Sequence, residues 1–227
     1  MKKFASLAAL AAAAATFAVA VPAQAANPEG KFQVKVLATG VLPDGKIDKI
    51  NINLVGLPAT SQTTVNDNVV PTLALEYYVT PNVSVETICC FTQHHATGAG
   101  VIAGADVAQH LLILPATLTL KYHLNAGAIK PYIGAGPALF FYFNEKPGAT
   151  AKLLGASTLK MDNKLGLALQ AGLDMPLGES GLGISLDAKK YFMKATTHFY
   201  TAGGVEALST THKLDPWVVS GGVYARF

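Results

Sequence analysis

Cysteine, charge and long hydrophobic runs are all scarce in this chain of 227 residues. The two cysteines, Cys89 and Cys90, are adjacent, so they point to opposite faces of an extended strand, and a disulfide between them would need strained geometry. Charged residues make up 14% of the chain and the net charge is +3, too close to neutral for a nucleic-acid partner. After Val21 no run approaches the ~20 apolar residues of a transmembrane helix. These shortages exclude a disulfide framework, a nucleic-acid-binding domain and a helical membrane protein; they leave the redox state of the two cysteines open.

The N-terminus has the three parts of a secretory signal peptide. A basic start and an uncharged, Ala-rich stretch lead to Pro22 and an A-x-A site that ends at Ala25. A membrane anchor is the alternative, because the apolar stretch is almost long enough to span a bilayer. The proline beside the cleavage site and the absence of a charged stop-transfer cluster favour cleavage. We therefore expect a cleaved signal peptide at 1–25 and a single mature domain at 26–227.

Hydrophobic residues nevertheless make up 51% of the chain. Backbone polar groups inside a bilayer must be satisfied by the protein itself, which leaves only helices and closed β-barrels. An apolar exported chain without long apolar runs therefore indicates a β-barrel, with a soluble periplasmic sandwich as the competing interpretation.

Alternation with a period of two residues separates these interpretations. In 165–177 the odd-numbered residues are apolar and the others are small or polar, and 112–124 and 182–189 alternate likewise. A helical period would scatter these leucines around the whole cylinder. The pattern predicts eight strands, at 30–42, 68–80, 82–92, 109–125, 129–143, 163–177, 181–194 and 214–227.

The connections between these segments alternate in length. The long ones are 43–67, 93–108, 144–162 and 195–213, and the short ones are Pro81, 125–128 and 178–180. Short periplasmic turns with longer external loops are typical of outer-membrane barrels, whereas a sandwich has no reason to sort its loops by length. The sequence predicts an all-β, eight-stranded antiparallel transmembrane barrel in the outer membrane of a Gram-negative bacterium.

The last strand carries a candidate assembly signal. Trp217, Val219 and Val223 share one face with the terminal Phe227. A terminal aromatic residue on an alternating strand resembles the signal that barrel-assembly machinery recognises. We expect Trp217 and Phe227 to serve this purpose.

Several stretches resemble the OmpW family of small outer-membrane proteins. They are KVLATGVLPD at 35–44, PTLALEYY with TPN at 71–82, LPATL and YHLN within 114–125, KPYIGAGP and FNE within 130–145, and DPWVV at 215–219. The chain departs from the family in its loops and at Cys89 and Cys90, where small residues are usual. The resemblance implies an eight-stranded barrel and a role in letting small hydrophobic molecules cross the outer membrane, but it does not identify the molecule.

If the leucine faces point outward, the residues that face the lumen are charged near the turns and apolar near the loops. Charged residues near the turns should pair in a narrow lumen as a structural plug, because unpaired buried charge is very unfavourable: Lys35, Glu76, Glu86, Lys121, Lys130, Asp174, Asp187 and Arg226. Inward positions toward the loops are apolar: Leu37, Val41, Ile88, Leu111, Ile113, Phe140, Tyr142, Met193 and Leu214. Core packing and an apolar binding funnel are both consistent with the second set, and the family resemblance favours the funnel.

Two prolines predict a lateral exit for solutes from a lumen that the charged plug closes near the turns. Proline removes a ladder hydrogen bond and is rare in central strands. A turn near Ala126 would place Pro115 roughly opposite Pro137 and weaken the wall there. Kinking of the strands is the simpler explanation, and a lateral port into the bilayer is the sharper one.

Other chemistry is weakly supported. Ser185 and His123 lie deep among the turn-side charges, not at an external rim, so we do not expect an enzyme. His94, His95, His110 and Asp106 lack a fixed ligand spacing, so no metal or cofactor is expected. The leading function is passive passage of small hydrophobic solutes within the outer-membrane lipid; a structural or receptor-type surface barrel is the alternative, and the oligomeric state is open.

Overall fold

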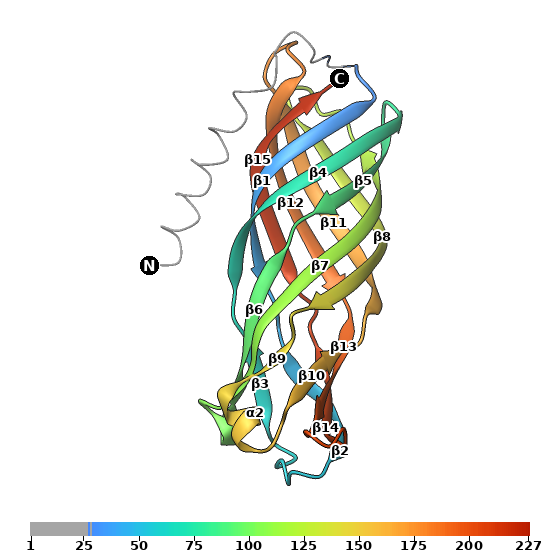
Figure 1. Ribbon diagram of the computed structural model, residues 1–227. Coiled ribbons are helices and arrows are strands. Elements are labelled where there is room, and N and C mark those ends of the chain that lie inside the picture. Colours follow the sequence, from blue (N-terminus) through green and yellow to red (C-terminus); the bar gives the residue numbers. More distant parts are fainter. Residues whose placement is uncertain (1–26, 28) are drawn as a thin grey trace.

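The computed structural model describes Asn27 and residues 29–227, which form a closed β-barrel (Figure 1). The expected signal peptide lies outside the described residues. Among the helices of the described part, none has the length and apolar character needed to cross a membrane.

Eight strand segments, which we call staves, form the wall of the barrel, and each pairs antiparallel with the next. They are β1 (Phe32–Leu42), β4 (Asn68–Thr80), β5 (Val83–Cys89) continued by β6 (Thr92–Ala99), β7 (Asp106–His123), β8 (Lys130–Phe143), β11 (Lys164–Pro176), β12 (Leu182–Phe192) and β15 (Trp217–Arg226). Pairing of β1 with β15 closes the ring, so the wall has no free edge within the membrane. The predicted eight-stranded antiparallel barrel is confirmed.

Outward side chains of the staves are apolar, as a wall in contact with lipid requires. Two groups of exposed aromatic residues mark the borders of this wall. The border near the turns has Phe32, Tyr77 and Tyr122, and the border near the loops has Phe91, Phe143, Phe192 and Trp217. Cys89 is exposed and Cys90 buried, and both are free, as expected for neighbours on a strand.

The four long connections are more ordered than the sequence indicated. They contain a short helix, α2 (Ala149–Leu153), a 3₁₀ turn at Gly100–Ile102, and β2 (Lys46–Asn53), β3 (Gln62–Val65), β9 (Lys146–Pro147), β10 (Thr158–Met161), β13 (Lys194–Tyr200) and β14 (Glu206–Lys213). The prediction of loops was wrong for these strands because their outer face meets water and is polar. In β13, Ala195, Thr197 and Phe199 are buried while Lys194 is exposed, which inverts the pattern of the membrane wall.

The extension beyond the membrane divides into two walls. One consists of β3, β6, β7 and β9, and the other is a separate sheet in the order β10-β13-β14-β2 (Figure 1, lower part). Side chains join the seam between β2 and β3: the Gln62 amide accepts from the Ile47 N–H at 3.1 Å and donates to its carbonyl oxygen at 3.3 Å. At the second seam, between β9 and β10, the Glu145 carboxylate accepts a hydrogen bond from the Met161 N–H at 2.9 Å. Side chains replace a backbone ladder at both seams.

Candidate functional site

The turn-side half of the lumen is filled by a polar plug. Its charged members are buried and come from six different strands: Lys35, Glu76, Glu86, Lys121, Asp174, Asp187 and Lys189. The alternation that turns leucines to the lipid turns these residues inward, so the strand pattern itself brings them together.

Three lysines hold the plug together, each between carboxylates. The Lys121 ammonium lies 2.9 Å from both Glu76 and Glu86. Lys35 reaches Glu76 at 3.0 Å, and Lys189 reaches Glu86 at 3.0 Å. Each of these charges is desolvated, so removal of one lysine would leave uncompensated negative charge on its partners in a buried site.

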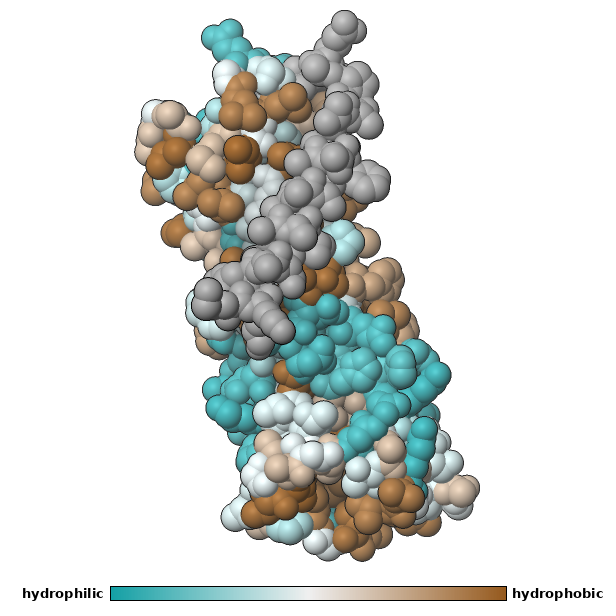
Figure 2. Space-filling model, turned by 90° about the vertical axis from the view of Figure 1, so that its left-hand side faces the viewer, coloured by the Kyte–Doolittle hydropathy of each residue, from teal (hydrophilic) through white to brown (hydrophobic). Residues whose placement is uncertain are grey.

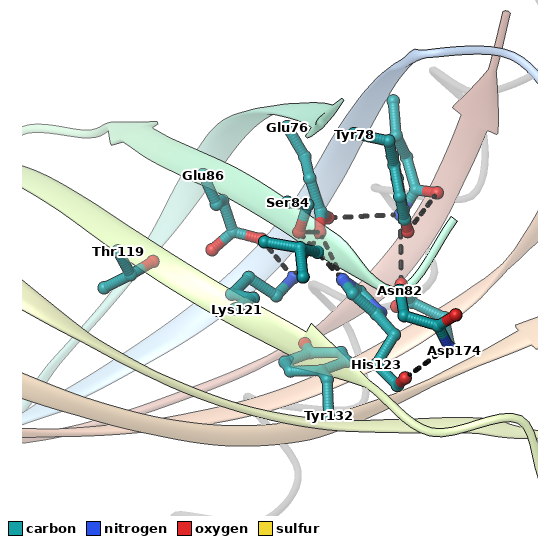
Figure 3. Close-up of polar contacts among 12 residues, drawn as sticks. Glu76, Tyr78, Asn82, Ser84, Glu86, Thr119, Lys121, His123, Tyr132 and Asp174 are labelled. Atoms are coloured by element: carbon teal, nitrogen blue, oxygen red, sulfur yellow. Dashed lines mark hydrogen bonds and ion pairs between the residues drawn. The ribbon is translucent and has the colours of Figure 1, made fainter. Parts of the chain in front are cut away.

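Further side chains hydrogen-bond to the carboxylates of the plug, and those around Glu76 are drawn in Figure 3. The Ser84 hydroxyl donates to Glu76 at 2.5 Å, and the His123 ring lies 2.9 Å from the same oxygen. Gln170 donates to Glu86 at 2.9 Å and to Asp187 at 2.6 Å. Among the side chains of this paragraph, the His123 Nδ1 is the buried polar atom that lacks a partner.

Aromatic rings cover the cations of the plug. The Lys121 ammonium is 3.7 Å from the centre of the Tyr132 ring, and the Arg226 guanidinium is 3.7 Å from that of Tyr78. Arg226 also donates to the Gly30 carbonyl at 2.6 Å, close to the end of the barrel. The lumen is therefore closed at its turn-side end.

The predicted plug residues lie in or beside this network, with one correction. Lys130 is only half-buried, because it is the first residue of β8 and lies at the turn-side end of the barrel, opposite Asp174. Sequence reasoning missed Lys189, although the alternation of Ser185 and Asp187 continues to it.

Above the plug the lumen opens into an apolar cavity. The empty space is about 940 Å³, including its opening to solvent. Phe140 and Tyr191 lie toward the plug, with ring centres 5.3 Å apart and edge to face, and the Tyr191 hydroxyl is 3.1 Å from that of Thr117. Cys90 and Pro115 also line the cavity. The change from paired charge to hydrocarbon therefore occurs within a few residues along each strand.

A second apolar cavity lies at the external tip and adjoins the first. It measures about 740 Å³, and Val107, Phe199 and His212 line both spaces. Burial lowers the pKa of the His212 ring below its usual value, and its two nitrogens lie 3.1 Å from the Thr63 hydroxyl and 2.7 Å from the Thr210 hydroxyl. Burial therefore favours the uncharged form of the ring at this junction. The two cavities are therefore neighbours that share part of their lining.

The structure divides the nine predicted funnel residues into two groups. Val41, Ile88, Leu111, Ile113, Phe140 and Leu214 line the cavity. Leu37, Tyr142 and Met193 belong to the core packed around it. The extension contributes lining residues that the sequence did not indicate, such as Phe199 and His212, because its strands had been taken for loops.

The predicted juxtaposition of Pro115 and Pro137 is wrong. Pro115 pairs with Phe140, because the hairpin is centred beyond Ala126, as the bridge from Ala126 to Ile129 shows. The ladder between β7 and β8 is nevertheless interrupted between the pairs Thr117–Ala138 and Leu120–Ala135, and Pro137 lies in that gap. Pro115 is buried against the cavity and Pro137 is exposed on the outer face.

The weaker candidates take structural positions. Ser185 donates to Asp174 at 2.6 Å within the plug, while His123 is bonded to Glu76. His94 contacts the Asn66 carbonyl oxygen, and the rings of His95 and His110 lie at a tilt to each other with centres 5.3 Å apart. These residues act as parts of the scaffold.

Comparisons with known proteins agree with this architecture. The model of the OmpW family matches residues 28–227. The chain is 35% identical over 197 residues to the uncharacterized outer-membrane protein y4mB of Sinorhizobium fredii, covering 86% of this chain and 80% of the relative. It is 30% identical over 203 residues to outer membrane protein W of Vibrio cholerae, covering 87% and 89% of the two chains.

Solved structures show the same fold. Outer membrane protein OprG from Pseudomonas aeruginosa superposes with a TM-score of 0.77 at 23% identity, covering 87% of this chain and 96% of OprG. Outer membrane protein AlkL, determined in lipid bilayers, gives a TM-score of 0.67 at 23% identity, covering 87% and 90%.

The matches settle the family and the compartment. OmpW-family barrels are non-enzymatic, which confirms that expectation, and the outer-membrane location is confirmed as well. The chain belongs to the OmpW family and is an eight-stranded barrel of the bacterial outer membrane.

Proposed function

We propose that the protein lets small hydrophobic molecules pass the outer membrane passively, and that they enter through the apolar cavities at its external end. The observation that carries this proposal is the change of lumen chemistry at Tyr191, from hydrocarbon above to paired charge below. A pore for polar solutes would keep a hydrated lumen throughout.

The cavity chemistry supports selection for apolar molecules. A hydrocarbon gains about 25 cal/mol for each Å² that it removes from water. A hydroxyl that loses its hydrogen bonds in such a space costs roughly 1–3 kcal/mol. A sugar, with several hydroxyls, would therefore be strongly disfavoured.

The plug requires an exit through the wall, and the stretch between β7 and β8 is our candidate. Pro115 faces the cavity, and the ladder interruption at Pro137 lies a short distance further toward the turns. Proline supplies no N–H, so this stretch opens at a lower cost than a complete ladder. The solute would then enter the outer leaflet directly.

Uptake measurements test the transport function. Cells that produce the protein should take up short alkanes faster than cells without it, while uptake of a small sugar is unchanged. Ala108→Phe fills the cavity at a buried lining position and should slow alkane uptake. Ala135→Phe adds the same side chain on the exposed face and is the control. Equal uptake by all these cells would contradict the proposal.

A crosslink tests the exit separately. Ala116 and Leu139 are directly paired across β7 and β8, so cysteines there would lock the wall in a Cys89→Ser, Cys90→Ser background. Cysteines at the paired Ala171 and Ala188 would lock an uninterrupted wall between β11 and β12. We expect slower alkane uptake only with the first crosslink, and also with Val at both Pro115 and Pro137. Undiminished uptake in the first crosslink and in the valine variant would exclude the port but leave entry into the cavity intact.

A further inference from the structure

Three lysines form a row across the outer face of the extension. Lys194 on β13 pairs with Lys213 on β14, and Lys213 pairs with Lys46 on β2. Their side chains are 56%, 51% and 68% exposed. We call these three residues the lysine row.

A row of like charges is unfavourable for the isolated sheet. Directly opposed residues on antiparallel strands have Cβ atoms about 4.5–5.5 Å apart, and like charges at that distance destabilise the pairing. Each lysine has a nearby aspartate: Asp44 at 3.2 Å from Lys46, Asp48 at 2.7 Å from Lys194, and Asp215 at 3.4 Å from Lys213. Such exposed ion pairs contribute little.

Positive charge remains in excess around the row. Lys49 is exposed on β2 next to it, and Lys190 lies on β12 on the membrane side. The Lys190 ammonium donates to the backbone carbonyl of Asp215 and lies 5.1 Å from the centre of the Trp217 ring. The five lysines therefore outnumber the three aspartates, and the face favours an anion.

The lysine row lies at the border of the membrane wall. Lys46 follows the exposed Leu42 on the same stave, and Lys213 precedes the exposed Trp217. Lys194 follows Phe192, whose side chain is also exposed. Because aromatic residues gather at membrane interfaces, the ammonium groups lie at the depth of the outer-leaflet headgroups. On the face shown in Figure 2, a hydrophilic band separates the largely apolar wall from the tip.

The opposite wall has different chemistry where its extension begins. Phe91 and His95 are exposed there, and the His95 ring lies at a tilt beside that of His110. That wall has the exposed Lys146 on β9, but among the described residues directly paired lysines occur only in the row.

We propose that the lysine row binds the phosphate groups of a phosphorylated glycolipid of the outer leaflet. A partner that fits must bring negative charge to the row and acyl chains to the apolar side chains directly below it. A phosphorylated lipid meets both requirements, whereas free phosphate meets only the first. The proposal is independent of transport, since the row faces away from the cavity.

Fluorescence of Trp217 provides the measurement, because the chain has a single tryptophan. The protein is reconstituted in phosphatidylcholine bilayers that contain a small fraction of a lipid A-type glycolipid with brominated acyl chains, which quench tryptophan on contact. The same glycolipid without phosphates serves as the comparison. We expect the phosphorylated form to be enriched next to Trp217 by about fivefold, the factor for ~1 kcal/mol.

Charge variants locate the effect. Lys46→Gln, Lys194→Gln and Lys213→Gln together should reduce quenching to that of the dephosphorylated lipid, whereas arginine at all three positions should retain it. Gln at Lys31, Lys146 and Lys152, which are exposed elsewhere, makes the same charge change and should have no effect. Heat-modifiable migration on a gel confirms that each variant is folded.

The outcomes decide the proposal. Equal quenching by the two glycolipids, or quenching that survives in the Gln variant of the row, would overturn it. Row-dependent binding of inorganic phosphate without row-dependent enrichment of the phosphorylated glycolipid would assign the row to free phosphate and would also overturn it. Enrichment of the phosphorylated glycolipid that depends on the row supports the lipid site.

Discussion

The membrane barrel and its external extension use the same staves with opposite side-chain patterns. Along β12, Ile184 and Leu186 are exposed, while Ser185 and Asp187 are buried. Along β13 the order reverses: Phe199 is buried and Lys194 is exposed. The solvent outside the wall decides the pattern, because lipid requires apolar side chains and water requires polar ones. The lumen then receives whichever residues remain.

The two regions also differ in how their walls are closed. In the membrane every stave pairs with its neighbours through backbone hydrogen bonds, because no water is present to satisfy a free edge. In the extension two seams are joined by side chains such as Gln62 and Glu145. Water outside the membrane can hydrogen-bond the backbone groups that these seams leave unpaired. The protein is therefore expected to be rigid in its membrane barrel and adaptable in its extension, where a ligand would enter.

Deletion of Phe227 should have the largest effect, because it removes the candidate assembly signal together with the last two hydrogen bonds between β15 and β1. Its N–H donates to the Phe32 carbonyl at 2.7 Å, and its carbonyl accepts from the Phe32 N–H at 3.0 Å. We expect the truncated chain to assemble poorly into the outer membrane, as measured by heat-modifiable migration. Phe227→Tyr keeps the backbone and an aromatic ring and should assemble. Normal assembly of the truncated chain would contradict the role of this residue.

Lys121→Met should destabilise the membrane barrel by up to about 3–5 kcal/mol, because it removes the ammonium group that Glu76 and Glu86 share and leaves them only Lys35 and Lys189 as buried partners. A lower midpoint of urea unfolding in bilayers would show this. Lys31→Met removes an exposed lysine and is the control. An unchanged midpoint would mean that water reaches the plug, so the two regions would differ less than their structure indicates.

Gln62→Ala should destabilise only the extension. It removes two side-chain hydrogen bonds to Ile47, which together contribute about 2 kcal/mol. Faster amide exchange at Ile47, with unchanged exchange in β1, is the expected result. Gln93→Ala on the exposed face of β6 is the matched control. If β1 exchanged faster as well, the extension and the barrel would form one cooperative unit.

Acid should weaken the extension more than the barrel, through His212. Burial lowers the pKa of this ring in the folded chain, so the unfolded chain binds a proton first as the pH falls. Stability that is present above the unfolded pKa of about 6.5 is then lost below it, by up to about 1.4 kcal/mol per pH unit. Amide exchange in β14 at neutral and mildly acid pH measures this loss. His212→Gln should reduce the pH dependence of this exchange, whereas His110→Gln, a change at an exposed histidine, should not. An equal pH dependence in the wild-type chain and in both variants would exclude His212 as its source.

Prediction from sequence succeeded where a residue's environment follows from its own strand. The inward direction of Glu76, Lys121 and Asp174 follows from the alternation of each strand, and the structure places all three in the plug. It failed where the environment depends on a register between strands. The hairpin of β7 and β8 is centred beyond Ala126, which moved Pro115 from the expected partner to Phe140.

The sequence alone determined the eight-stranded barrel and the division of its lumen, because lipid contact requires an apolar residue at every second position of each membrane strand. The strands of the extension lack that signal, so only the tertiary structure showed that they continue the barrel as two walls. Tertiary structure also decided which side chains meet across strands: Gln62 with Ile47, Lys213 with both Lys46 and Lys194, and Phe199 with the cavity. Contacts between segments distant in sequence depend on register and curvature, and these are properties of the closed sheet as a whole.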